Sequence, residues 1–353
     1  MRIIFGVFDW GLGHATRDAP LIDEMLKRGH SVDILTTGRA LALLKNRFRN
    51  RCCYFDVPSI VVPYPKNSLF VLNFARKIPK MLADINRARE LSSQIIKSGS
   101  YDVVISDCRY DVYDKVTNSY LINHQLRFDA PPGIEQISEK WLAERMKKYR
   151  YIIVPDFDKD NLSGRLSHNL RYFSRRRIKY IGILSQAKKK KVKEDIDYFI
   201  PISGPEPQRT IFEKKILKGA KSLRGKIVIA LGRPEIKISK SKRNMVIYGF
   251  LDSKKQEEMM NRAKFIITRS GYTTVMEIAE LGKKNVLFVP TPGQTEQEYL
   301  ADLYEEKGYF HHVHQDNIDL LNDIKKSTNL RAYNPPWRTE ESIKKFMEFV
   351  GIK

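Results

Sequence analysis

The start of the chain sets the strongest limit on how it folds. Residues 2–7 form a short, mostly apolar run that is typical of a buried strand. A glycine loop follows, then a segment over 16–27 whose apolar residues recur with helical spacing, and then a second apolar run over 31–36. A strand, a helix and a strand in this order predict a parallel sheet with a crossover helix.

This alternation recurs along the chain and predicts two α/β, doubly wound domains. A length of 353 residues suits two domains rather than one. We expect a first domain over 1–165, a basic linker and hinge region over 166–195, a second domain over 196–334, and a C-terminal helix over 335–353 that packs back on the first domain. The run 180–184 is expected to begin the second sheet. Two such domains predict a ligand cleft at the carboxyl ends of both sheets.

The composition indicates where the protein is located and which kinds of partner it binds. Lys and Arg exceed Asp and Glu by a formal net charge of +22. That excess indicates an anionic partner, namely nucleic acid, a phosphorylated small molecule or an anionic membrane surface, or else a solvated lysine-rich surface. No apolar run reaches the ~18 residues of a membrane span. The cysteines are Cys52, Cys53 and Cys108, without metal-ligand spacing, so we expect a reduced, cytoplasmic protein.

The first glycine loop carries candidate chemistry in residues 11–17. Backbone amides at Gly13 and at the start of the following helix favour an oxyanion. Arg17 lies one turn further on and is suited to a charge-assisted contact with phosphate. His14 is of a residue type that accepts a proton from a hydroxyl near neutral pH. The alternative is a tight turn in which His14 caps the helix.

The second half of the chain has loops in matching positions. Ser203 and Gly204 follow the strand over 198–202, and Arg209 comes shortly afterwards, which suits a diphosphate. Arg233 follows the next strand and is a further candidate. The alternative for the first loop is a turn stiffened by Pro205 and Pro207.

Residues 269–277 form the most specific pattern in the sequence. Arg269 and a serine-glycine turn, Ser270-Gly271, follow the strand over 265–268, and Thr273 lies in the first turn of a helix. These residues suit a phosphate. Glu277 lies one to two turns into the helix, where a carboxylate would accept hydrogen bonds from two ribose hydroxyls; the alternative is a favourable interaction with the helix dipole.

Further candidates end other strands. Gln297 and Glu298 follow the next strand and would bind sugar hydroxyls. Asp107 and Arg109 end one strand of the first domain, and His124 follows another, so these three are acceptor-side candidates together with Arg17. A histidine group at 311, 312 and 314 is not a strong metal pattern, and no metal is expected.

The segment Thr268-Arg269-Ser270-Gly271, with Glu277-Ile278-Ala279 and Glu296-Gln297-Glu298-Tyr299 after it, resembles the donor-binding region of GT-B glycosyltransferases. The nearest pattern is that of the bacterial undecaprenyl-diphospho-muramoylpentapeptide N-acetylglucosaminyltransferase family. The resemblance implies two Rossmann-like domains facing a central cleft, with an acceptor side in the first and a nucleotide-sugar site in the second. It also implies that Glu277 binds the ribose, that Ser270 and Gly271 lie near the diphosphate, and that Gln297 and Glu298 touch the sugar. The family has two glutamines at that pair, so one member is changed here.

The predicted function is therefore glycosyl transfer from a nucleoside-diphosphate sugar, such as UDP-N-acetylglucosamine, to an acceptor hydroxyl. The resemblance implies inversion, and no cofactor is required beyond the sugar-nucleotide co-substrate. His14 is expected to act as the base or to position the acceptor. The acceptor is unknown; a lipid-linked one is considered, with residues 70–80 docking to a membrane surface.

Two alternatives stay open. The loop Gly-Leu-Gly-His-Ala-Thr-Arg also resembles that of a GT-B hydrolase, so a UDP-sugar hydrolase or 2-epimerase is the enzymatic rival. The basic tracts over 175–179 and 188–193 favour a nucleic-acid-binding protein, although the sequence contains no recognition motif for it.

Overall fold

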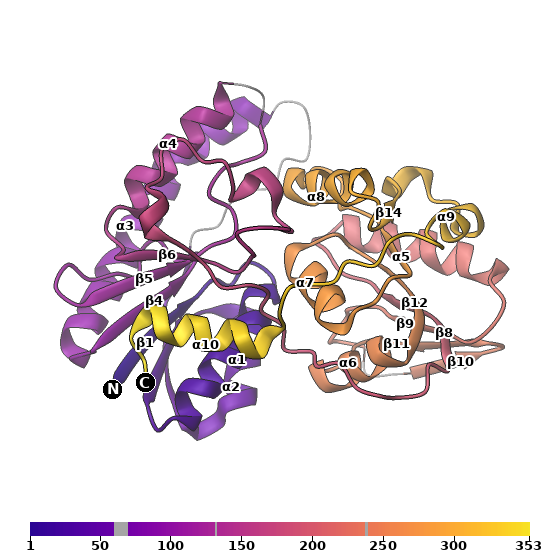
Figure 1. Ribbon diagram of the computed structural model, residues 1–353, viewed down its shortest axis with the longest axis horizontal. Helices are drawn as coiled ribbons and strands as arrows, with labels where there is room; N and C mark the ends of the chain where they lie inside the picture. The colour runs from indigo at the N-terminus through magenta and orange to yellow at the C-terminus, as the bar shows by residue number, and fades with distance from the viewer. Residues whose placement is uncertain (60–69, 131–132, 237–238) are drawn as a thin grey trace. The chain divides into compact units, whose positions relative to one another are not determined.

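A computed structural model of the protein describes residues 1–59, 70–130, 133–236 and 239–353, with the side chains of 70–82 and 242 left out (Figure 1). The chain forms two compact units. Unit 1 comprises Met1–Gln186 and Pro336–Lys353, and unit 2 comprises Ala187–Pro335. Among the described residues, no helix is both long enough and apolar enough to cross a membrane.

Unit 1 is built on a seven-stranded sheet whose described strand pairs are all parallel, in the order β3-β2-β1-β4-β5-β6-β7. The central strands are buried almost throughout because helices cover both faces of a parallel sheet. The strands are β1 (Arg2–Val7), β2 (Ser31–Thr36), β3 (Cys52–Asp56), β4 (Val103–Asp107), β5 (Asn118–Ile122), β6 (Tyr151–Val154) and β7 (Ile178–Tyr180).

The helices of unit 1 include one from the end of the chain. They are α1 (Gly13–Lys27), α2 (Gly38–Phe48), α3 (Phe70–Gly99), α4 (Ile134–Met146) and α10 (Thr339–Val350). The Nε1 of Trp337 donates to the carbonyl of Ile181 at 2.9 Å, and the Oγ1 of Thr339 accepts from the amide of Ser185 at 3.0 Å. These bonds attach the C-terminal segment to unit 1.

The structure differs from the predicted linker over 166–195. Residues 166–186 belong to unit 1, and β7 pairs with β6 as the last strand of its sheet, so the run 180–184 does not begin the second sheet. The basic side chains of Arg175 and Arg176 are exposed, whereas Ile181, Ile183 and Leu184 are fully buried. The exposed arginines directly before β7 masked this short strand in the sequence pattern.

Unit 2 has a second seven-stranded sheet, in the order β10-β11-β9-β8-β12-β13-β14. Its pairs are parallel except that β10 runs antiparallel to β11 at one edge. The strands are β8 (Ile196–Pro201), β9 (Ile227–Ala230), β10 (Ser239–Lys242), β11 (Met245–Tyr248), β12 (Ala263–Thr268), β13 (Val286–Phe288) and β14 (His311–His312).

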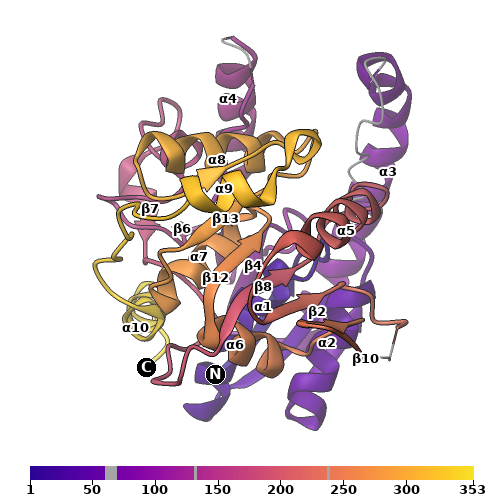
Figure 2. The same ribbon diagram turned by 90° about the vertical axis from the view of Figure 1, so that its right-hand side faces the viewer.

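The helices of unit 2 are α5 (Gln208–Gly219), α6 (Ser253–Arg262), α7 (Tyr272–Leu281), α8 (Thr295–Glu306) and α9 (Leu320–Lys326). Phe212 and Ile216 of α5 share one hydrophobic core with Leu320 of α9 and with residues of the strands. Figure 2 shows the helices α5 and α9 together with the strands of this unit. The lysine-rich β10 and the short α9 were not predicted. The doubly wound α/β fold of both halves, however, is as predicted. In each unit the loops that carry the predicted site residues follow the carboxyl ends of parallel strands.

Candidate active site

In unit 1, three chain segments bring their polar residues to one edge of the sheet. β1 leads into the loop before α1, which starts at Gly13, so His14 and Arg17 lie in the first turns of that helix. Asp107 is the last residue of β4, and His124 follows the neighbouring β5. Because β1, β4 and β5 are parallel neighbours, their carboxyl ends meet at this edge.

These four residues form one hydrogen-bonded cluster. The Nδ1 of His14 lies 2.7 Å from the Oδ2 of Asp107. Arg17 donates through Nε to the same oxygen at 3.2 Å, and its Nη2 donates to the other carboxylate oxygen. Its Nη1 lies 3.0 Å from the Nδ1 of His124. Arg17 and Asp107 are fully buried, whereas the side chain of His14 is 14% exposed and is therefore accessible to a ligand.

The cluster fixes the charges of its members. Burial works against ionisation of Asp107, but Arg17 and then His14 outweigh it and hold the pKa of this carboxyl well below its usual value. Burial lowers the pKa of His14, and the positive charge of Arg17 adds to this effect, while Asp107 opposes it. The result favours a neutral imidazole beside a carboxylate-guanidinium pair.

A fully buried carboxyl belongs to the same cluster and was not predicted. No described N–H or O–H group donates to either oxygen of Asp18, which interacts with Asp107. Burial and then the charge of Asp107 raise the pKa of Asp18 well above its usual value. The sequence contained a signal: Asp18 lies three, four and seven residues before Leu21, Ile22 and Met25, on the apolar face of α1.

In unit 2, Arg269 joins three loops. It follows β12, and its Nη1 donates to the carbonyls of Val289 and Pro290, both at 3.0 Å. Its Nε donates to the carbonyl of Ser203 at 3.3 Å, and its Nη2 donates to the Oε1 of Gln315 at 2.5 Å. The loops after β8, β12 and β13 are thereby held together.

The charge of Arg269 has no acidic partner among the described residues. The guanidinium lies over the ring of Phe212, 4.1 Å from its centroid, and its hydrogen bonds go to neutral oxygens. Burial lowers the pKa of Arg269 to about 9. An uncompensated buried cation of this kind favours a nearby anion.

The loops tied by Arg269 bring other predicted residues together. The Oγ of Ser270 donates to the carbonyl of Gln297 at 2.7 Å, and a Cβ added to Gly271 would lie 3.8 Å from the Nε2 of Gln297. Gln297 accepts from the amide of Thr291 at 3.0 Å. Thr291, which was not predicted, has a buried Oγ1 without a hydrogen-bond partner among the described residues, and lies beside Gly204.

Glu277 is a buried carboxyl in the second turn of α7. It is 7% exposed, and no described residue forms a hydrogen bond or ion pair with it. Burial, and then the charge of Glu257 on α6, raise the pKa of Glu277 to about 7. A carboxylate in this position lacks the donors that would stabilise it, so it is suited to accept them from a ligand.

Two family models and a curated relative agree on one activity. Residues 1–126 match the model described as glycosyl transferase family 1, and residues 209–349 match the glycosyltransferase family 28 C-terminal domain. A protein of Methanosarcina mazei described as an uncharacterized glycosyltransferase is 24% identical over 332 residues, which cover 88% of this chain and 84% of that protein.

Solved structures of the same fold match almost the full length of the chain. MurG of Acinetobacter baumannii has a TM-score of 0.58 at 12% identity, covering 100% of both chains. UGT89C1 of Arabidopsis thaliana, solved with UDP-L-rhamnose, has a TM-score of 0.62 at 14% identity, covering 99% of this chain and 93% of that one. This chain is a glycosyltransferase of the GT-B fold. The predicted fold, enzyme class and family resemblance of the glycosyltransferase are confirmed.

Two arginines that the sequence predicted as ligand contacts form ion pairs within the glycosyltransferase. Arg109 is bound by Asp111, with its Nη2 2.7 Å from the Oδ2, and its Nη1 donates to the carbonyl of Val57. Arg209 is paired with Glu206 and with Glu213, at 2.6 and 2.5 Å. These arginines brace loops, so the structure does not leave their charges available as the sequence interpretation assumed.

The remaining predicted residues lie at the borders of the loops. The Nε of Arg233 donates to Glu235 at 2.9 Å, so its charge is also shared. Thr273 is half-buried in the first turn of α7. Glu298 accepts from the amide of Gly293 at 3.1 Å and thereby supports the loop before α8.

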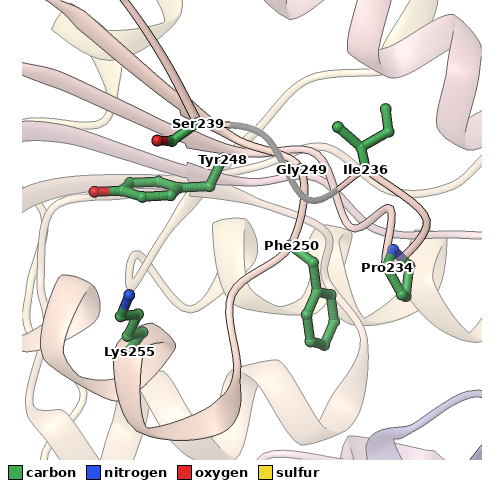
Figure 3. A pocket seen from close by; sticks show the side chains of 7 residues that line it. All are labelled: Pro234, Ile236, Ser239, Tyr248, Gly249, Phe250 and Lys255. Atoms are coloured by element: carbon green, nitrogen blue, oxygen red, sulfur yellow. The ribbon is translucent and has the colours of Figure 1, made fainter.

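A hollow of about 330 Å³ lies beyond β9 and β11 in the glycosyltransferase (Figure 3). Phe250, Tyr248 and Lys255 line it, with Pro234, Ile236, Ser239 and Gly249. A Cβ at Gly249 would lie 1.9 Å from the carbonyl of Ile236, so only glycine fits there. Lys255 is on α6, the helix whose Glu257 acts on Glu277 through its charge.

Among the residues that the structure describes, one group in the glycosyltransferase has the spacing of a metal site. The ligand atoms of His14, Asp107 and Cys108 lie within 4.8 Å of one another. Arg17, however, donates to both carboxylate oxygens of Asp107. Its positive charge takes the place that a metal cation would need.

Proposed function

We propose that this glycosyltransferase moves a sugar from a UDP-sugar, such as UDP-N-acetylglucosamine, to an acceptor hydroxyl, with inversion at the anomeric carbon. The observation that carries the proposal is Glu277, a buried carboxyl without a described donor in the second turn of α7, a helix that follows a loop suited to phosphate. The choice of UDP rests on the family resemblance and on the ligand of the Arabidopsis neighbour.

The donor would be held by unit 2. Glu277 would accept hydrogen bonds from the two ribose hydroxyls, which supply the donors that it lacks. The diphosphate would lie against Ser203-Gly204 and Ser270-Gly271, where the amino end of α7 and the uncompensated charge of Arg269 favour negative charge. Gln297 and Glu298 would contact the sugar. The hollow at Phe250 would hold the nucleobase, because its aromatic ring is suited to stacking.

His14 would act as the base on the acceptor. The Nδ1 of His14 lies 2.7 Å from Asp107 and 2.9 Å from Arg17. The shorter contact is with an anionic acceptor, so a neutral imidazole would carry its proton on Nδ1 and donate it to Asp107. That tautomer leaves a lone pair on Nε2. A histidine with a lowered pKa is unprotonated at neutral pH and ready to accept the hydroxyl proton.

The proposed step balances as one displacement. The acceptor oxygen forms a bond to the anomeric carbon, its proton passes to His14 Nε2, and the bond from that carbon to the diphosphate oxygen breaks. The nucleoside diphosphate leaves with the electron pair and is stabilised by helix amides and Arg269. A single displacement without an enzyme nucleophile inverts the anomeric centre.

The test follows release of UDP from UDP-sugars with and without candidate acceptor alcohols. Release that depends on an acceptor and yields a glycosylated product supports transfer. Equally rapid release in its absence would instead support the hydrolase or 2-epimerase alternative. RNA or DNA binding that survives Glu277→Ala and His14→Ala would support the nucleic-acid-binding alternative.

We also propose that the acceptor is met at an anionic membrane surface, through α4. The predicted membrane contact over 70–80 concerns side chains outside the described residues. On α4, however, Ile134, Ile137 and Trp141 are 59%, 71% and 47% exposed. Their spacing places them along one face of the helix, with Lys140 exposed beside them and Arg145 over the Trp141 ring. An apolar helix face flanked by cations suits anionic lipid headgroups.

Sedimentation with vesicles tests this contact. We expect binding to vesicles containing phosphatidylglycerol, little binding to phosphatidylcholine alone, and a loss of about tenfold or more in Ile137→Ser with Trp141→Ser. Leu321→Ser, which changes an apolar side chain of 48% exposure on α9, is the matched control. Equal binding by the α4 variant would overturn the contact, and self-association that the variant abolishes would point to a second copy of the chain.

A further inference from the structure

The proposed mechanism does not explain the protonation state of Asp18, a carboxyl beside the catalytic cluster. Its carboxyl is fully buried, and neither oxygen accepts a hydrogen bond from a described donor. Asp107, which belongs to the same cluster and whose charge acts on Asp18, is itself a carboxylate that Arg17 holds in the ionised form. A second carboxylate at this place would be buried without donors and beside a like charge.

The described groups around these two carboxyls provide one positive charge. Arg17 is the cation that faces Asp18 on α1. A guanidinium only donates, so the Nδ1 of His124, 3.0 Å from Arg17, accepts and carries no proton. Burial raises the pKa of the Cys108 thiol well above its usual value, and the lowered pKa of His14 keeps its imidazole neutral. One anion therefore balances the cluster, and that anion is Asp107.

We propose that Asp18 is a neutral carboxylic acid in the working enzyme and that it donates its proton in a hydrogen bond to Asp107. Asp18 is then a positioning residue. It holds the Asp107 carboxylate toward His14 and adds no charge of its own. An ionised Asp18 would add a negative charge to the cluster and draw a proton onto His14, which would lose the lone pair that accepts the acceptor proton. The role for His14 rests on the proposed function.

Infrared difference spectroscopy tests the protonation state without any substrate. The full-length protein is compared with Asp18→Asn at pH 8.5. We expect the wild-type spectrum to contain the C=O stretching band of a protonated carboxyl that Asp18→Asn lacks. If that band is missing from the difference spectrum, the proposal is overturned whether or not the protein transfers sugar.

The pH profile of kcat/KM tests the effect on His14. Asp18→Asn keeps an N–H donor to Asp107 and the charge balance, so we expect its acid limb to coincide with that of the wild type. Asp18→Leu removes the donor and leaves Asp107 free to attract a proton to His14, so we expect its acid limb to lie about one pH unit higher.

Two results would contradict this role. An acid limb that moves to lower pH in Asp18→Asn would mean that Asp18 is ionised in the wild type, because removing a negative charge lowers the pKa of His14. A lower rate in Asp18→Leu without movement of the acid limb would mean that Asp18 only fills space. If Asp18→Leu does not fold, the band and the profile of Asp18→Asn still decide the question.

Discussion

The two units handle buried charge in opposite ways. In unit 1, Asp107 is neutralised by Arg17, and His14 completes the cluster. In unit 2, Arg269 has no described acidic partner, and Glu277 has no described donor. An unpaired buried charge costs several kcal/mol, so it is retained where a ligand supplies its partner. We infer that the ionised Asp107 of unit 1 already has its partners before a substrate binds. Arg269 and Glu277 of unit 2, in contrast, gain theirs from the bound ligand.

The largest effect on activity is expected in unit 1, from a substitution of His14. His14→Asn removes the proposed base and should lower kcat by roughly 10²- to 10⁴-fold while leaving the affinity for UDP unchanged. Steady-state kinetics and calorimetry measure the two quantities. His30→Asn, which changes a histidine that contacts Lys353, serves as the control. A large loss of UDP affinity in His14→Asn would contradict this prediction, because it would mean that His14 contacts the nucleotide rather than the acceptor.

The next effect concerns Glu277. Glu277→Gln should weaken UDP binding about ten- to a hundredfold, because two hydrogen bonds lose a charged acceptor. It should also stabilise the protein without ligand. The folded pKa of about 7 lies above the usual 4.5, so ionisation destabilises the fold increasingly as pH rises between these values.

This stability change has a defined pH window. Removing the titration should raise the free energy of unfolding by about 3 kcal/mol above pH 7 and by almost nothing below about pH 4. Denaturant unfolding at several pH values measures it. Glu280→Gln, equally buried on the same helix, should leave UDP affinity unchanged. A variant Glu277→Gln that is less stable than the wild type at pH 8 would show that the carboxylate already has a partner.

Two arginines of unit 2, Arg269 and Arg209, distinguish a charge that is available to a ligand from a charge that is paired within the protein. Arg269→Met should weaken UDP binding about tenfold, because the field of an uncompensated cation is lost. Arg209→Met removes a charge that Glu206 and Glu213 already share, so binding should change about twofold or less. Calorimetric titration with UDP measures the dissociation constant of each variant relative to the wild type. Equal losses would contradict the distinction between paired and unpaired charges.

The last effect concerns stability and comes from the backbone of the diphosphate loop. Gly204 has a φ of +121°, which side chains rarely adopt, and an added Cβ would meet only ordinary contacts. Gly204→Ala should therefore lower stability by about 1–3 kcal/mol through backbone strain. Gly271→Ala, at a φ of −64°, should change it by less than about 0.5 kcal/mol. Thermal unfolding compares the two, and equal shifts would exclude strain at Gly204.

Local pattern was enough to predict much of this fold. Buried strands such as β1 and β12 and the helix α7 are visible as apolar runs and helical spacing, which depend on neighbouring residues. The sequence could not predict that Asp18 interacts with Asp107, because three crossover connections separate β1 from β4 along the chain. For the same reason the sequence did not predict that Arg269 donates to carbonyls of two other loops. The strand β7 was missed because exposed arginines precede it.

The central claim is that a nucleotide completes unit 2 by ionising Glu277. The most direct measurement is calorimetric titration of UDP-N-acetylglucosamine at pH 7 in buffers of different ionisation enthalpy. With a pKa of about 7, Glu277 is half protonated without ligand, so wild-type protein should release about half a proton per nucleotide bound. Glu277→Gln should bind more weakly and release none. Absence of binding, or the same proton release from both proteins, would contradict the account.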